Sequence, residues 1–249
     1  MRLVTRLMCA ATLSLAVAAP ASQAAAQETI AQFFQATPGK NVSWVNQGTG
    51  GHLYTGTGAS AAGVATFFNF LTPELVGIGP VTATFLLDAT AAAGNPAQLD
   101  GNGGISQDKI AGSFSFTYTG MTPLAGCLGG SCKNLLSGTF NQGLLSGDAG
   151  GSTGDVGSST SLAGHLVNFT SDYIDFTLVT WKDFDFGLEA ISPALTASPG
   201  QALDSFQAAS SGSFGAAVPE PATWAMMILG FGGIGSLLRS RRRGMVLSA

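Results

Sequence analysis

Much of the chain between residues 27 and 218 alternates apolar and polar side chains with a period of two. The clearest run is 113–119, Ser-Phe-Ser-Phe-Thr-Tyr-Thr, in which aromatic and hydroxyl residues alternate. Residues 182–188 repeat the pattern with acids on the polar side, and residues 81–87 place four apolar side chains on one face. Successive side chains of a strand point to opposite faces of a sheet, so these runs predict strands with one buried face.

Further segments fit the same element less clearly. Residues 173–181 are predicted to form a strand with Ile174, Phe176 and Leu178 on one face, and residues 64–71, with three phenylalanines, a more fully buried strand. Weaker strands are predicted at 42–45, 51–57, 134–140, 160–169 and 203–215. A short helix is the expectation for residues 28–36, the one segment of this region with apolar residues at helical spacing.

Glycine, serine and threonine dominate the segments between these runs, and no sustained 3.6-residue repeat appears. Many short strands with glycine-rich turns and no alternation of strands with helices predict an all-β fold. We expect an antiparallel β-sandwich or jelly-roll-like domain over residues 27–210. The small residues 211–218 are predicted to be a flexible linker.

The first 26 residues have the order of parts of a secretory signal peptide. Arg2 and Arg6 precede an apolar stretch at residues 7–19, and three alanines offer a cleavage site after Ala26. An N-terminal anchor that is retained is the alternative. Cleavage would leave Gln27 as the new N-terminus.

Residues 222–238 contain no charged side chain. Four arginines follow them, namely Arg239, Arg241, Arg242 and Arg243. At 1.5 Å per residue the uncharged stretch spans about 26 Å, which is just long enough for a transmembrane helix. The arginines would form a basic stop at 239–243 and leave a cytoplasmic tail at 244–249. Outside the membrane, prolines on both sides of Glu220 predict an extended, accessible tripeptide.

These parts, in this order, resemble the PEP-CTERM sorting signal and more narrowly its PEPxxWA variant. The residues that carry the resemblance are Pro219, Glu220, Pro221, Trp224 and Ala225. The resemblance implies a Gram-negative bacterial protein that uses the general export machinery, is held transiently in the inner membrane, and is cut by an exosortase. Tails of this kind are also named "ice-binding protein C-terminal domain", which describes the tail alone. An ordinary single-pass anchor is the alternative.

The resemblance covers residues 219–243, about a tenth of the chain, so it predicts routing to the cell surface or extracellular matrix and no chemistry. All six arginines lie in the two terminal segments. The residues between these segments include four lysines and thirteen acids, which give a formal charge of −9. Nucleic acids and anionic lipids need cationic contacts, so neither is an expected partner of this region. Exopolysaccharide is a candidate partner.

Two cysteines, Cys127 and Cys132, remain after the predicted signal peptide, which contains Cys9. Four residues separate them, two of them glycine, and in an oxidising compartment a local disulfide is expected. A redox pair or half of a zinc site are the alternatives.

No familiar catalytic motif occurs in the chain, so we predict a non-enzymatic domain without catalytic residues, cofactor or metal. The two histidines, His52 and His165, stand apart in the sequence. Five acids are close enough in sequence to share one region of a sheet: Asp172, Asp175, Asp183, Asp185 and Glu189. A cleft that holds two of them beside a histidine would favour a hydrolase.

Binding of carbohydrate or ice is the other hypothesis for the domain. Residues 100–108 begin like an oxygen-rich calcium loop but lack the closing glutamate of an EF-hand, so calcium support stays an alternative. Thr-x-Thr pairs at 55–57, 82–84 and 117–119 offer hydroxyls on strands. A sugar platform would use exposed aromatic rings, for which Trp44, Tyr54 and Trp181 are available.

Overall fold

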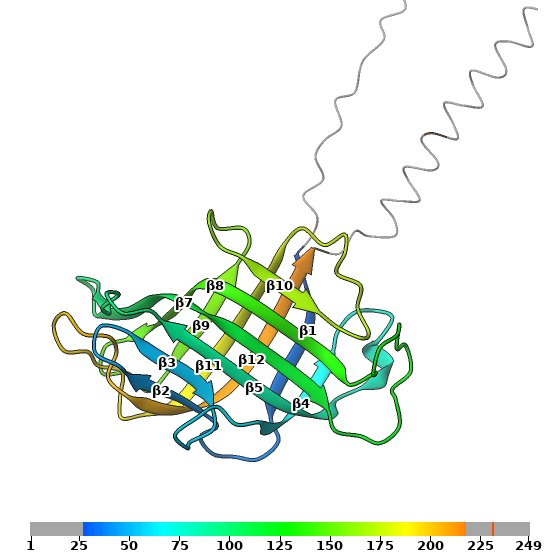
Figure 1. The fold of residues 1–249 in the computed structure, drawn as a ribbon, viewed down its shortest axis with the longest axis horizontal. Helices are drawn as coiled ribbons and strands as arrows, with labels where there is room; N and C mark the ends of the chain where they lie inside the picture. Colours follow the sequence, from blue (N-terminus) through cyan, green and yellow to red (C-terminus); the bar gives the residue numbers. More distant parts are fainter. Residues whose placement is uncertain (1–26, 218–230, 232–249) are drawn as a thin grey trace, which may run out of the picture.

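The structure is a computed structural model that describes residues 27–217 and Phe231 (Figure 1). One 3-10 helix, η1 (Val76–Ile78), accompanies twelve strands. The strands are β1 (Gln27–Gln35), β2 (Val42–Asn46), β3 (Gly51–Thr55), β4 (Val64–Phe70), β5 (Val81–Ala91), β6 (Gln98–Leu99), β7 (Gly104–Tyr118), β8 (Asn134–Asp148), β9 (Gly154–Ser159), β10 (Val167–Thr170), β11 (Lys182–Ser192) and β12 (Phe206–Ala217).

All strands belong to one antiparallel sheet that closes on itself. Hydrogen-bonded neighbours run from β1 through β4, β5, β7, β8, β9 and β11 to β12, and β12 pairs again with β1. The β2–β3 hairpin makes a second connection between β12 and β5. The predicted all-β antiparallel class is confirmed.

The expected division into two sheets of a sandwich is wrong, because the pairing is continuous. The long strands β7 and β8 exchange neighbours along their length and contain bulges near Ile110, with positive φ at Lys109 and Gln142. Bulges bend a strand and increase its twist, which allows one sheet to wrap around its own core. Such bending cannot be predicted from the alternation of apolar and polar residues in the sequence.

The interior of the sheet is filled with aromatic rings. Phe33 of β1 lies at the centre, with its ring 4.8 Å from the rings of both Phe85 and Phe116 and 5.5 Å from that of Phe186. Phe85 and Phe116 are stacked at 4.6 Å. Buried aromatic side chains remove a large apolar area from water, so this cluster is the main source of stability that the sheet shares.

The predicted linker is part of this structure. Residues 211–217 lie in β12, where Phe214 and Ala216 are fully buried, and only residue 218 falls outside the described part. A Cβ atom on Gly212 would lie 2.8 Å from ring atoms of both Phe186 and Phe33. The small residues of β12 therefore make room for the rings of neighbouring strands. Their small size is a requirement of packing and does not indicate a linker.

Three other predicted elements are corrected. Residues 28–36, expected as a helix, lie in strand β1, with Ile30, Ala31 and Phe33 buried. Residues 173–181 form a loop and not a strand, because their buried residues recur every third position. Those buried residues are Tyr173, Phe176 and Val179. The predicted strand 160–169 is instead the whole connection between β9 and β10, residues 160–166, followed by the first three residues of β10.

The predicted disulfide between Cys127 and Cys132 is confirmed, with the two Cα atoms 5.7 Å apart. It closes a turn in the loop between β7 and β8. The predicted signal peptide, its cleavage after Ala26, the tripeptide at 219–221 and the arginine cluster lie outside the described residues. So does the expected membrane helix at 222–238, apart from Phe231; within the part of the chain that the structure describes, no helix has the length and apolarity to cross a membrane.

Candidate functional site

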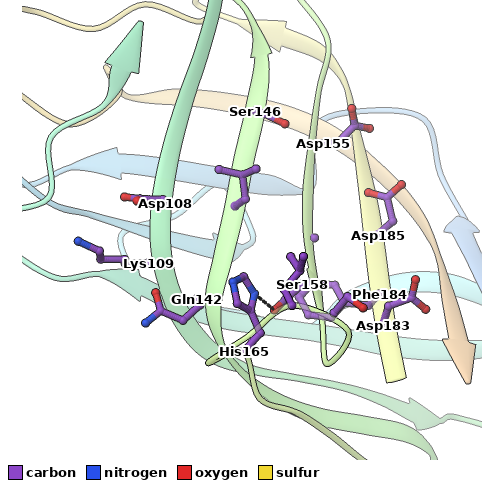
Figure 2. Close-up of a pocket in the computed structure, with 14 residues that line it drawn as sticks. Asp108, Lys109, Gln142, Ser146, Asp155, Ser158, His165, Asp183, Phe184 and Asp185 are labelled. Atoms are coloured by element: carbon purple, nitrogen blue, oxygen red, sulfur yellow. Dashed lines mark hydrogen bonds between the residues drawn. The ribbon is translucent and has the colours of Figure 1, made fainter. Parts of the chain in front are cut away.

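A groove on the outer surface of the sheet gathers most of the polar chemistry of the described residues. It has a volume of about 540 Å³ and lies over β8, β9 and β11, with Asp108 and Lys109 of β7 at one side and the 160–166 connection at the other. Figure 2 shows Asp155, Asp185 and Asp183 one below the other along β9 and β11, with His165 across from them beside Ser158. Leu144 and Leu162, both largely exposed, add apolar surface to the same groove.

The room for these side chains comes from glycines on the neighbouring strands. Asp185 pairs across the sheet with Gly157, and Asp155 with Gly187. A Cβ atom on Gly215 of β12 would lie 2.0 Å from Oδ1 of Asp183, so the carboxylate occupies the space that a side chain would fill. Alternation on β11 turns Phe184 and Phe186 inward and the aspartates outward.

The electrostatics of the groove favour uptake of protons or of hydroxyl and cationic groups. Burial raises the pKa of the Asp183 carboxyl, although a hydrogen bond from the Gly215 amide partly opposes this. Burial also raises the pKa of Asp185, and the negative charge of Asp155 adds to the effect. A desolvated carboxylate gains from any partner that donates hydrogen bonds to it.

His165 and Ser158 contact each other within the groove. The distance from Ser158 Oγ to His165 Nδ1 is 3.4 Å, while the Ser158 hydroxyl donates to the Asn141 carbonyl at 3.1 Å. Ser158 is also buried. A serine nucleophile would need its hydroxyl proton directed at the histidine base and its oxygen open to substrate. In this geometry the pair acts to hold the 160–166 connection against β8.

The other acids named from the sequence lie elsewhere. The Asp172 carboxylate accepts hydrogen bonds from the Lys133 and Asn134 amides at 2.9 and 3.1 Å, which closes the loop before β8. The Thr177 hydroxyl and amide donate to Asp175 and lower its pKa. Glu189 is exposed on β11 and does not line the groove.

The remaining histidine has a partner of its own. His52 Nε2 lies 2.8 Å from Asp88 Oδ1, and its ring is 4.6 Å from that of Tyr54. The pair sits on β3 and β5, apart from the groove residues.

The calcium hypothesis gains no support from the loop at 100–108. Oδ1 of Asp100 accepts hydrogen bonds from the amides of Asn102 and Gly104 at 2.9 and 2.7 Å, so it caps the turn between β6 and β7. Within the described residues, no group of three or more acids, histidines or cysteines is placed to hold a metal ion.

The aromatic residues considered for a sugar platform do not form one. Trp44 is fully buried and donates its indole N–H to the Leu203 carbonyl at 2.9 Å. Tyr54 is buried as well. Two of the threonine pairs do come together, because Thr84 of β5 faces Thr117 of β7 and Thr119 bonds to Thr82. Thr55 is buried, so the third pair is separate.

The described sheet ends where the sequence match to a known family begins. Ala217, the last residue of β12, donates its amide to the Trp181 carbonyl at 3.1 Å. Residues 217–243 match the family described as the PEP-CTERM protein-sorting motif. This chain carries a PEP-CTERM sorting motif. No curated protein and no solved structure is significantly similar to the chain.

The PEP-CTERM motif indicates an exported, cell-surface protein that is targeted to an exosortase. It covers the tripeptide Pro219, Glu220 and Pro221 and the arginines up to Arg243, which are the residues that the sequence resemblance used. It says nothing about residues 27–216, so the chemistry of the sheet has to be argued from its own surface.

Sequence reasoning found only part of the groove. It named Asp183, Asp185 and His165 but missed Asp155 and Ser158. Polar residues between glycines at 154–159 were a weak signal for a strand with one wet face. Their neighbours on β8 and β11 follow from pairing between distant segments, which a single sequence does not reveal.

Proposed function

We propose that this protein is a surface or extracellular-matrix component that is anchored in the inner membrane until an exosortase processes its PEP-CTERM motif. In this proposal the domain at residues 27–217 acts outside the cell without catalysis. The observation that carries the proposal is the match of residues 217–243 to the sorting family.

Further features of the chain support export and the anchored intermediate. The region between the terminal segments has a formal charge of −9 and contains no arginine, which suits a soluble or matrix-bound protein. Its two cysteines form a disulfide, a bond that persists in oxidising compartments. The uncharged residues 222–238 with arginines after them support the anchored intermediate.

The test replaces Pro219, Glu220 and Pro221 with alanine in the native host. We expect full-length protein to accumulate in the inner membrane, while the parent chain appears outside as a shorter species by intact-mass measurement. A matched control replaces Pro73 and Glu74, an exposed Pro-Glu pair in a loop of the domain. Normal release of the triple variant would refute the sorting proposal.

A second candidate function is favoured by the groove over β8, β9 and β11. The groove is lined by four aspartates, Lys109 and His165, with Leu144 and Leu162 as apolar surface, and this mixture suits a hydroxyl-rich ligand such as a saccharide. Carboxylates accept hydrogen bonds from sugar hydroxyls, and leucine side chains pack on the apolar face of a sugar ring. Paired carboxylates are also the residue type that glycoside hydrolysis uses, so hydrolysis has to be tested beside binding.

Glycan-array binding and release of reducing sugar would separate binding from hydrolysis. The double variant Asp183→Asn, Asp185→Asn should lose whichever activity the groove has. Glu189→Gln is the matched control, since it removes an acid from the same strand outside the groove. Equal activity of the double variant and the parent would exclude the groove.

A further inference from the structure

We propose that one end of the sheet rests on the bilayer surface before processing, with Met121, Leu128 and Leu178 inserted into the lipid interface. This inference rests on the membrane-anchored intermediate proposed above. The end in question, here called the terminal end, consists of the loops at residues 71–80, 119–133 and 171–181, together with the start of β1 and the end of β12.

The register of the strands brings these segments together. Gln27 pairs with Ala217 and Lys182 with Ala216, so the 171–181 loop leaves the sheet beside the last residue of β12. Thr117 pairs with Asn134, and Phe68 with Val81, which places the other two loops at the same end. Figure 1 shows the ends of β1 and β12 beside these connections.

The terminal end carries the most exposed apolar side chains of the domain. Among the large apolar residues in 27–217, the three with the greatest exposed fraction are Met121 at 100%, Leu178 at 71% and Leu128 at 68%. Val76, in the 71–80 loop, is 54% exposed. Single exposed apolar residues are common, but clustering at one end is typical of a surface that contacts a protein or a membrane.

The loops that present these residues are well braced. The Leu128 amide donates to the Asp172 carbonyl at 2.8 Å, and the Tyr173 hydroxyl donates to the Cys132 carbonyl at 2.7 Å. The disulfide closes the turn that contains Leu128. A Cβ atom on Gly126 would lie 2.8 Å from Leu75, which shows how closely the first two loops pack. The exposure of Leu128 is therefore held by the fold.

The short connection to the predicted membrane segment identifies the bilayer as the surface that this end contacts. Four residues, 218–221, separate the last strand residue from the uncharged segment that begins at Ala222. The five Cα–Cα steps from Ala217 to Ala222 reach at most about 18 Å when fully extended. While residues 222–238 are in the membrane, Ala217 at the end of β12 stays within that distance of the bilayer surface, and the loops beside it are the part of the domain nearest to the interface.

The charges at this end favour insertion of apolar side chains over attraction to anionic lipid. Both lysines here donate to backbone carbonyls, Lys133 to Gly120 and Lys182 to Val179 at 2.6 Å. Glu74, Asp172 and Asp175 add negative charge. Contact should therefore be insensitive to salt. A few apolar side chains alone give weak, reversible membrane binding, so cleavage of the tether should release the domain.

The test places a nitroxide label on the chain in which Pro219, Glu220 and Pro221 are replaced with alanine, the variant expected to stay in the inner membrane, in right-side-out inner-membrane vesicles from the host. Met121→Cys and Leu178→Cys are labelled separately, and Leu99→Cys is the control, because Leu99 is 63% exposed but pairs with Ile105 at the opposite end of the sheet. The native thiols at Cys127 and Cys132 are oxidised and do not compete for the label.

We expect labels at 121 and 178 to collide severalfold more with oxygen than with a water-soluble nickel complex, at low and high salt, and the label at 99 to show the reverse. Equal behaviour of all three labels would overturn the inference. So would shielding of 121 and 178 from both reagents, which would mean that a protein segment covers this end. If the chain is absent from the vesicles, the anchored intermediate itself fails, a separate result.

Discussion

Phe33→Ala should destabilise the domain far more than Phe34→Ala, although the two residues are adjacent. Phe33 is buried at the centre of the aromatic cluster, with the Phe85 and Phe116 rings 4.8 Å from its own. Removing a buried phenylalanine side chain costs about 3–5 kcal/mol, through lost burial and the cavity that remains. For a domain of this size, each kcal/mol shifts Tm by about 2–4 °C, so the expected loss is about 6–20 °C.

Phe34 points to the outer face of β1. Its ring is 40% exposed and lies 5.3 Å from the ring of Phe67, a cross-strand contact worth about 1 kcal/mol or less. Urea and thermal unfolding of the exported protein, followed by the fluorescence of buried Trp44, would measure both variants. Similar losses for the two would refute the reasoning, because an amphipathic helix at 28–36 can bury both rings and a strand cannot.

Three further predictions concern the groove and the disulfide. Because burial raises the pKa of Asp183 in the folded state, the folded chain holds its proton to higher pH than the unfolded chain, and stability falls as the pH rises through that interval. Asp183→Asn should therefore be more stable than the parent above the interval and lose this pH dependence; urea unfolding over a pH series that shows a less stable variant at neutral pH would contradict it. Replacing both Cys127 and Cys132 with serine opens a loop of six residues and should cost about 2 kcal/mol, measured as a lower Tm. Reductant should lower the Tm of the parent in the same way and should not change the Tm of the variant. Gly215→Ala places a Cβ atom 2.0 Å from Asp183 Oδ1 and should cost about 1–3 kcal/mol, whereas Gly101→Ala, with open space around it, should unfold with the parent.

Alternation predicted strands well where one face is buried and the other wet. The runs at 81–87, 113–119 and 182–188 all lie in strands, β5, β7 and β11. Their extents were underestimated, because β7 continues through bulged and polar residues from Gly104 onward. A bulge interrupts the period of two, so the sequence pattern ends there although the strand and its pairing continue.

The failures share a physical cause. A short apolar run cannot decide between a helix and a strand. One face of a helix would hold Ile30, Phe33 and Phe34 together, but the same residues also fit a strand in which only some of them are buried. In β12, glycine, serine and alanine suggested flexibility, but Gly212 is small because the Phe33 and Phe186 rings lie against it. Both answers depend on neighbours that are distant in sequence.

The sorting motif was predictable from the sequence because its parts are consecutive along the chain. The groove was not, since Asp155 and Asp185 meet only through the pairing of β9 with β11. The closed sheet also determines how the two regions relate. Ala217 is buried and hydrogen-bonded to the 171–181 loop, so the sorting motif begins at the last residue of the folded sheet. The tripeptide at 219–221 must therefore be recognised within a few residues of a rigid strand end. If the domain rests on the bilayer as proposed above, its apolar terminal end lies beside the tripeptide when an exosortase acts.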